Sequence, residues 1–155
     1  MKIYMAANDS QTVESWTNVF RARDGVDVVE ARAASVEADI VVMAGVWAFE
    51  RYDGRPTRDE AQILPNETGD GMPSWVVIPP YRPFVRKGSE IAVREDFAEV
   101  SPAYFAIVQS LRVIRREFGN DVVVLLNLPL LGMDDPHDEQ TPLSVATAID
   151  EAMSE

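Results

Sequence analysis

Apolar residues along the chain fall either into short, nearly unbroken runs or into stripes with helical spacing. Runs rich in apolar residues lie at 2–6, 26–30, 38–44 and 74–78, and the longest is Val122–Gly132. A strand that is apolar on both faces is typical of a parallel sheet with helices on both sides. We therefore expect a strand in each run, with the strand of Val122–Gly132 buried on both faces.

The segments between these runs have the spacing of amphipathic helices. Residues 10–22 place Val13, Trp16 and Phe20 on one face, and Asn8–Ser10 offers capping side chains. A longer helix begins at Ser101–Pro102 and ends at Gly119, and a last helix begins at Thr141–Pro142. The buried faces of these two helices are expected to comprise Tyr104, Ile107, Val108, Leu111, Ile114 and Phe118 in the first, and Leu143, Ala146, Ile149 and Met153 in the second.

Other segments are less regular. Gly45–Asp59 is expected to be a loop because it contains the turn dipeptides Asp53–Gly54 and Arg55–Pro56, and a short helix follows it if the capping-box spacing of Thr57–Glu60 is used. Pro65–Pro73 is expected to be an exposed loop, whereas residues 90–94 fit either a short strand or irregular structure.

Strands that alternate with helices predict an α/β fold, here a three-layer α/β/α sandwich with a largely parallel sheet. Right-handed crossovers place helices on both faces of such a sheet. A length of 155 residues corresponds to one domain, which we assign to residues 1–155. Ligands of such sheets bind outside the carboxyl ends of the strands, so Val122–Gly132 and the acidic segment after it indicate where a site should lie.

Composition excludes several functional classes. The net charge of −12 argues against general nucleic-acid binding, and the lack of cysteine excludes disulfides and thiolate chemistry. No apolar run approaches the ~20 residues of a membrane span, so we expect a soluble cytoplasmic protein that does not bind membranes. Six of the fourteen cationic residues lie in 51–58 and 82–87, where they either offset the acidic surface or form a patch for an anion or an acidic partner.

Two loops combine aromatic side chains with arginine, as a site for a base and a phosphate would. The first, Gly45–Gly54, contains Trp47 and Arg51, and the second contains Tyr81 and Arg82. The alternative for both loops is that the aromatic rings anchor them to the core.

A third loop follows Val122–Gly132 and contains Asp134, Asp135 and the only histidine, His137. These side chains suit metal binding or acid–base chemistry, or they form a hydrated acidic loop before a helix N-terminus. Glycine-rich phosphate loops and the nucleophile elbow of hydrolases are absent from the sequence.

The order of these segments resembles that of the macro domains, particularly the compact type of bacterial and phage genomes. The resemblance rests on Met1–Tyr4, Glu14–Phe20, Val26–Glu30, Ala38–Val42, Met72–Ile78, Ala103–Ala106 and Val122–Gly132. It implies a macro-like mixed sheet and an ADP-ribose site, since the family binds ADP-ribose and some members hydrolyse it from proteins or metabolites.

The residues that bind ADP-ribose in the family are replaced in this chain. The Gly-Asp pair that holds the adenine falls near Ala31–Arg32, and the Ala-Asn pair that faces the distal ribose falls near Gly45–Val46. The first glycine run shrinks to Asp53–Gly54, and Pro129–Gly132 keeps one glycine of the second phosphate loop, with Leu130, Leu131 and Met133 crowding the approach of a diphosphate. Loss of the adenine contact alone removes about 1–3 kcal/mol of binding.

We therefore expect ordinary ADP-ribose chemistry to be lost or weakened. The first hypothesis is a non-catalytic binding or interaction module, without cofactor or bound metal, for a protein partner or a small nucleotide-like ligand. The alternative is binding or hydrolysis of ADP-ribose or a related nucleotide, which would make the chain an ADP-ribosyl hydrolase or a similar enzyme, with no catalytic residue assigned. The expected ligand contacts are Gly45, Trp47, Arg51, Gly54, Tyr81, Arg82, Gly132 and Asp134.

Overall fold

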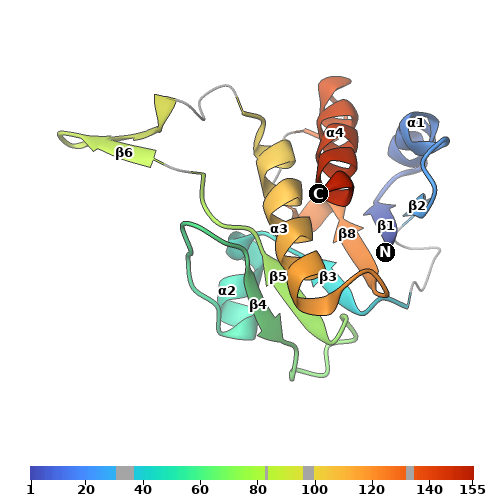
Figure 1. Cartoon of the computed structure of the whole chain (residues 1–155), viewed down its shortest axis with the longest axis horizontal. Helices are drawn as coiled ribbons and strands as arrows, with labels where there is room; N and C mark the ends of the chain where they lie inside the picture. The colour runs from blue at the N-terminus through green and yellow to red at the C-terminus, as the bar shows by residue number, and fades with distance from the viewer. Residues whose placement is uncertain (31–36, 83, 96–99, 132–134) are drawn as a thin grey trace.

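The computed structural model describes residues 1–30, 37–82, 84–95, 100–131 and 135–155. Its elements follow the chain in the order expected for an α/β fold (Figure 1). They are β1 (Lys2–Ala7), α1 (Ser10–Phe20), β2 (Val26–Glu30), β3 (Ile40–Val42), α2 (Gly45–Tyr52), β4 (Gln62–Pro65), β5 (Trp75–Ile78), β6 (Phe84–Lys87), β7 (Glu90–Val93), α3 (Pro102–Phe118), β8 (Val123–Asn127), the 3₁₀ turn η2 (Leu128–Leu130) and α4 (Gln140–Ser154).

The main sheet has six strands in the order β2-β1-β8-β3-β5-β4. Every pair is parallel except β4–β5, which is antiparallel and forms one edge. The strand from the longest apolar run, β8, pairs with β1 and β3 and so lies inside the sheet. The predicted α/β class and largely parallel sheet are therefore confirmed.

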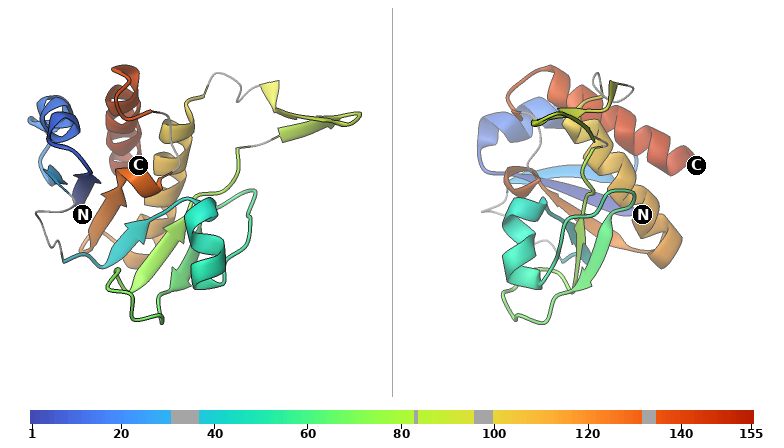
Figure 2. Two further views of the ribbon diagram at one scale, coloured as in Figure 1. Left: turned by 180° about the vertical axis from the view of Figure 1, so that it is seen from behind. Right: turned by 90° about the vertical axis from the view of Figure 1, so that its left-hand side faces the viewer.

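Helices cover both faces of the sheet, but unequally. Trp16 and Phe20 of α1 share one apolar cluster with α3 and α4. Ala48 and Tyr52 of α2 belong to a second cluster on the opposite face of β3 and β5. Figure 2 shows α2 and α3 on opposite sides of these strands. Right-handed crossovers explain the division, because β1→β2 and β5→β8 run in one direction across the sheet and β3→β5 runs in the other.

The helices predicted from apolar stripes are confirmed. Asp9 caps α1 by accepting a hydrogen bond from the Thr12 amide, and Ser101 caps α3, which ends at Gly119. The central positions of the α3 stripe are buried, while Tyr104 and Phe118 at its ends are half-buried. In α4, Leu143 is half exposed rather than buried because it lies on the outer side of the first turn. No helix of the described residues is both long and apolar enough to cross a membrane.

The expectation of a loop at residues 45–59 is wrong. Its first half forms α2, which ends where Asp53 adopts a left-handed conformation with φ 59°. The short helix expected after Thr57–Glu60 does not form. Thr57 Oγ1 donates to the Glu60 carbonyl instead, and the chain continues into β4, a strand that the apolar pattern did not indicate.

Residues 90–94 adopt the strand alternative as β7, which pairs with β6 in a separate two-stranded hairpin. Figures 1 and 2 show this hairpin projecting away from the body of the molecule, between β5 and α3. We call residues 84–93 the arm.

Trp16 is the largest fully buried side chain, and its Nε1 donates to the Pro136 carbonyl at 2.9 Å, which joins α1 to the loop before α4. We expect Trp16→Phe to lower the free energy of unfolding by about 2–3 kcal/mol, through a smaller apolar side chain and an unpaired carbonyl. Urea unfolding followed by circular dichroism measures it.

Trp75→Phe is the matched control, since Trp75 is 37% exposed and packs edge-on against Phe118. A loss of about 1 kcal/mol or less is expected there. Equal losses in the two variants would contradict the role of the Trp16 contact.

Candidate functional site

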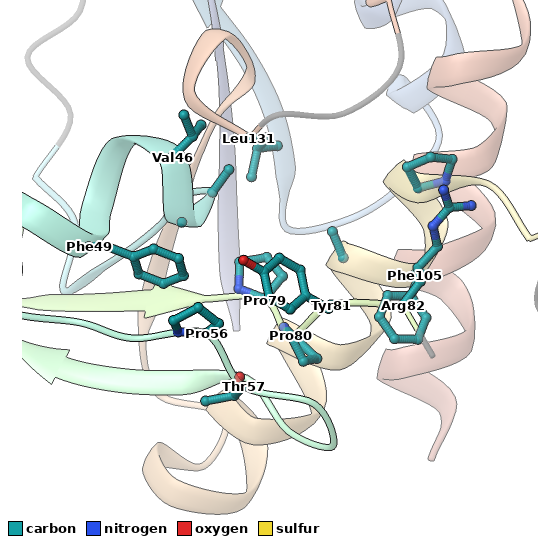
Figure 3. A pocket seen from close by; sticks show the side chains of 14 residues that line it. Val46, Phe49, Pro56, Thr57, Pro79, Pro80, Tyr81, Arg82, Phe105 and Leu131 are labelled. Atoms are coloured by element: carbon teal, nitrogen blue, oxygen red, sulfur yellow. The ribbon is translucent and has the colours of Figure 1, made fainter. Parts of the chain in front are cut away.

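A cleft of about 470 Å³ opens at the carboxyl ends of β3, β5 and β8 (Figure 3). This is the edge of the sheet where parallel α/β folds bind ligands. Its walls come from α2, from the segment after β5, and from α3 with the end of η2. The lining consists of Ala44, Gly45, Val46, Phe49, Pro56, Thr57, Pro79, Pro80, Tyr81, Arg82, Pro102, Phe105, Ala106 and Leu131.

The α2 wall presents the start of a helix to the cleft. Ala44 is the N-cap and gives no side-chain cap, so the first amides of α2, at Gly45 and Val46, have no partner inside the helix. The Phe49 ring lies over Gly45, where an added Cβ would stand 2.3 Å from the ring. The Phe49 ring can therefore lie against the first turn of α2 because glycine at position 45 has no side chain.

The second wall is the segment that leaves β5. Pro79 and Pro80 end the strand, and the Tyr81 amide donates to the Thr57 carbonyl at 3.0 Å. The Tyr81 ring is half exposed at the cleft mouth. Arg82 is half-buried, and its Nη1 donates to the Val100 carbonyl at 3.0 Å; a guanidinium has five N–H donors in all.

The third wall is apolar. Pro102 and Phe105 come from the first turn of α3, whose N-terminus points to the same edge of the sheet, and Leu131 follows η2. Leu131 is buried and forms part of this wall.

Few groups in the cleft can ionise. Of the described lining residues, Tyr81 and Arg82 have ionisable side chains, and Arg82 has the only charge. A half-buried cation on one wall and the start of α2 on the opposite wall both favour an anion in the cleft, within a chain of net charge −12. Three aromatic rings (Phe49, Tyr81 and Phe105) supply flat apolar surface.

A hydrogen-bonded turn holds the C-terminal end of α2 against the hairpin of β4 and β5. Asp70 accepts hydrogen bonds from Tyr52 Oη at 2.6 Å, from Asn66 Nδ2 at 2.8 Å and from the Met72 amide at 3.0 Å. Burial would raise the pKa of Asp70, but these hydrogen bonds outweigh it and hold the pKa well below its usual range. Burial and the bond to Asp70 raise the pKa of Tyr52.

A second, smaller cavity of about 190 Å³ lies at the ends of β1 and β8. Thr12 Oγ1 donates to Asp9 Oδ2 at 2.9 Å and lies 3.4 Å from His137 Nδ1. The bonds from the Thr12 amide and hydroxyl lower the pKa of Asp9. These contacts fix the start of α1, and the only imidazole of the chain lies here rather than in the main cleft.

The structure brings together three of the residues expected to contact a ligand. Gly45, Tyr81 and Arg82 line the cleft, whereas Trp47 is 52% exposed on the outer side of α2 and is not part of the lining. Arg51 lies 4.0 Å from Asp70, at the other end of α2. Gly54 lies against the side chains of Leu64 and Ile78. Gly132, Asp134 and the pair Ala31–Arg32 fall outside the described residues.

Several residues of the cleft were not singled out by sequence. Pro102 and Phe105 were not expected to line a cleft because their helix was assigned only a core face. The helix start at Ser101–Pro102 could have indicated that these residues lie at the cleft. A helix that leads into the last parallel strand must begin at the carboxyl edge of the sheet.

The alternative of a metal site at Asp134, Asp135 and His137 can be examined only in part, because Asp134 lies outside the described residues. The Asp135 carboxylate accepts a hydrogen bond from the His137 amide, and its carbonyl accepts one from Thr141 Oγ1. Over the described residues, no three His, Asp or Glu side chains are grouped so that they could hold a metal ion. The resolved part of this loop has the geometry of a turn before α4.

Comparison of the chain with protein-family models, with characterised proteins and with solved structures gives no match. The function is therefore argued from the cleft and its surroundings.

The Tyr52–Asp70 bond is testable through stability. We expect Tyr52→Phe to lower the free energy of unfolding at pH 7 by about 1–2 kcal/mol, because it removes a buried donor to a carboxylate. The pKa of Asp70 is lower in the folded chain, so this contribution is complete above about pH 4 and is lost as the pH falls. Urea unfolding from about pH 7 to pH 2 should show a difference between the two proteins that persists at pH 4 and narrows only at the acid end of the range.

Tyr81→Phe serves as the control because the Tyr81 ring is half exposed and belongs to the other wall of the cleft. It should leave stability within about 0.5 kcal/mol of the wild type at every pH. If the loss of stability in Tyr52→Phe stays constant down to the lowest pH, the role assigned to the Tyr52–Asp70 hydrogen bond is contradicted.

Proposed function

We propose that this chain is a divergent macro-like domain that acts as a non-catalytic binding module. Its cleft takes a small ligand that joins a flat ring to an anionic group, as a nucleotide does. Ordinary ADP-ribose chemistry is lost or weakened, since the residues that the family uses are replaced.

The single observation that carries this proposal is the pairing of aromatic walls with one cation in the cleft. Phe49 and Tyr81 offer surfaces on which a ring can stack, the buried Phe105 adds apolar lining, and Arg82 offers a planar fork of donors for a phosphate or carboxylate. The two amides at the start of α2 add donors on the opposite wall.

The volume of the cleft suits a ligand of this kind. About 470 Å³ lies within the range of small-molecule sites, which are lined mainly by apolar and aromatic groups with a few polar ones. Proton transfer needs a base beside the reacting atom, and the imidazole of His137 lines the separate cavity beside Asp9 and Thr12. These observations support recognition rather than hydrolysis.

Isothermal titration calorimetry against ADP-ribose, NAD, AMP and cyclic nucleotides tests the proposal. We expect at least one of these ligands to bind with a Kd of about 10 μM or tighter. Arg82→Ala should weaken binding at least about tenfold through loss of the anion contact, and Tyr81→Ala should do the same through loss of stacking.

Arg51→Ala is the matched control, because Arg51 is near Asp70 and outside the lining. It removes the same charge from the chain, so equal weakening by Arg51→Ala and Arg82→Ala would show that net charge rather than the cleft governs binding. The proposal would also be contradicted if none of these ligands binds, or if a cleaved product is released during incubation.

A further inference from the structure

The arm contributes no residue to the lining of the cleft, so the proposed ligand gives it no role. Its strands β6 and β7 pair only with each other and join no strand of the main sheet. An isolated two-stranded hairpin is at best marginally stable in water, and four residues per strand extend it by about 13 Å. In Figure 1 it stands clear of the body, so a surface outside this chain is needed to cover it.

The two faces of the arm differ in chemistry. Arg86 lies opposite Ile91 in the antiparallel register, and Lys87 lies opposite Glu90. Directly opposed residues share a face. One face therefore presents a cation beside an isoleucine that is 63% exposed, whereas the other presents two opposite charges that can neutralise each other.

The charge of the arm region is opposite to that of the rest of the chain. Residues 84–93 contain two cationic side chains and one carboxylate, a net charge of +1, so the remaining residues carry −13. A nucleic acid would be attracted by the arm but repelled by the body. An acidic protein surface fits both facts, because opposite charges on two protein surfaces favour association.

This chain itself carries a surface that matches the Arg86–Ile91 face. At the start of α2, Val46 is 80% exposed and also forms part of the cleft lining, and Trp47 is 52% exposed on the outer side of the helix. Glu50, also exposed, lies three and four positions further along the same helix and thus on the same side. The surface combines apolar contact for Ile91, a ring for the Arg86 guanidinium and a carboxylate to pair with it.

We infer that two copies of this chain form a symmetric dimer by exchanging arms. The Arg86–Ile91 face of each arm lies on the Val46–Trp47–Glu50 surface of the other copy. Within one copy the arm projects away from α2, so the contact is made between copies (Figure 1). The exchange is reciprocal, as a two-fold axis requires, and buries both exposed apolar surfaces. Because Val46 also lines the cleft, the dimer is tested without an added cleft ligand.

Sedimentation velocity from about 1 to 100 μM chain, at low and high salt, tests this inference. A dimer is expected at the upper concentrations and should dissociate as salt increases. Arg86→Glu and Ile91→Ser should each raise the dimer Kd at least about tenfold, and Glu50→Arg should do so as well. Combining Arg86→Glu with Glu50→Arg restores opposite charges across the interface and should restore the dimer.

Arg86→Gln and Lys87→Gln are the matched pair, since each removes one positive charge from a different face of the arm and neither places like charges opposite each other. Arg86→Gln should raise the dimer Kd, and Lys87→Gln should leave it within about threefold of the wild-type value. Trp47 provides a second readout, because its fluorescence should shift to shorter wavelength in the dimer and not in the Arg86→Glu variant.

Four results would overturn the inference. They are a monomer at every concentration, a dimer that Arg86→Glu leaves intact, equal weakening by Arg86→Gln and Lys87→Gln, and no recovery in the double variant. Binding of a DNA duplex by the monomer that Arg86→Glu abolishes would also overturn it, because the arm would then serve a nucleic acid. Since the cleft proposal is tested by calorimetry with Arg82→Ala, either proposal can fail while the other stands.

Discussion

The parallel pairing of β8 with both β1 and β3 is the constraint on which the rest of the structure depends. Because β8 enters the sheet last and lies between strands formed much earlier in the sequence, the chain must cross the sheet in both directions. The right-handedness of those crossings assigns α1 and α3 to one face and α2 to the other. It also brings the ends of β3, β5 and β8 together, which is where the cleft opens.

Elements whose local pattern and tertiary environment agree were predictable. The stripe of α3, with Ser101 before it and Gly119 after it, predicts a helix from capping and apolar spacing alone, and burial then acts on the same face. In α2 the local sequence pattern and the tertiary environment disagree. Gly45 and the Asp53–Gly54 turn enclose eight residues, of which only Ala48 and Tyr52 are buried, so turn signals outweigh a weak stripe.

Strand β4 and the arm show a different limit of sequence reasoning. Strand β4 is an edge strand that is only half-buried and ends at Pro65, so it lacks the apolar alternation of an inner strand. The arm is held by pairing within the hairpin, and its exposed positions follow no core. Such segments are specified by long-range pairing, which a pattern of apolar residues does not reveal.

The candidate site was predictable in its place but not in its composition. The rule that ligands bind beyond the carboxyl ends of parallel strands locates the cleft, and Tyr81 and Arg82 follow from it because they come directly after β5. Arg51 and Trp47 were expected there only because a loop could have turned them inward. The helix that forms instead directs Arg51 toward Asp70 and leaves Trp47 in solvent.

Four prolines line the cleft: Pro56, Pro79, Pro80 and Pro102. A proline ring fixes φ and has no amide hydrogen, so these walls have little backbone freedom and offer no donors of their own. A ligand therefore enters a cleft that is already formed, and the protein loses little conformational entropy when the ligand binds. Hydrogen bonding is confined to a few directions, from Arg82 and the start of α2, so orientation as well as size decides which molecules fit.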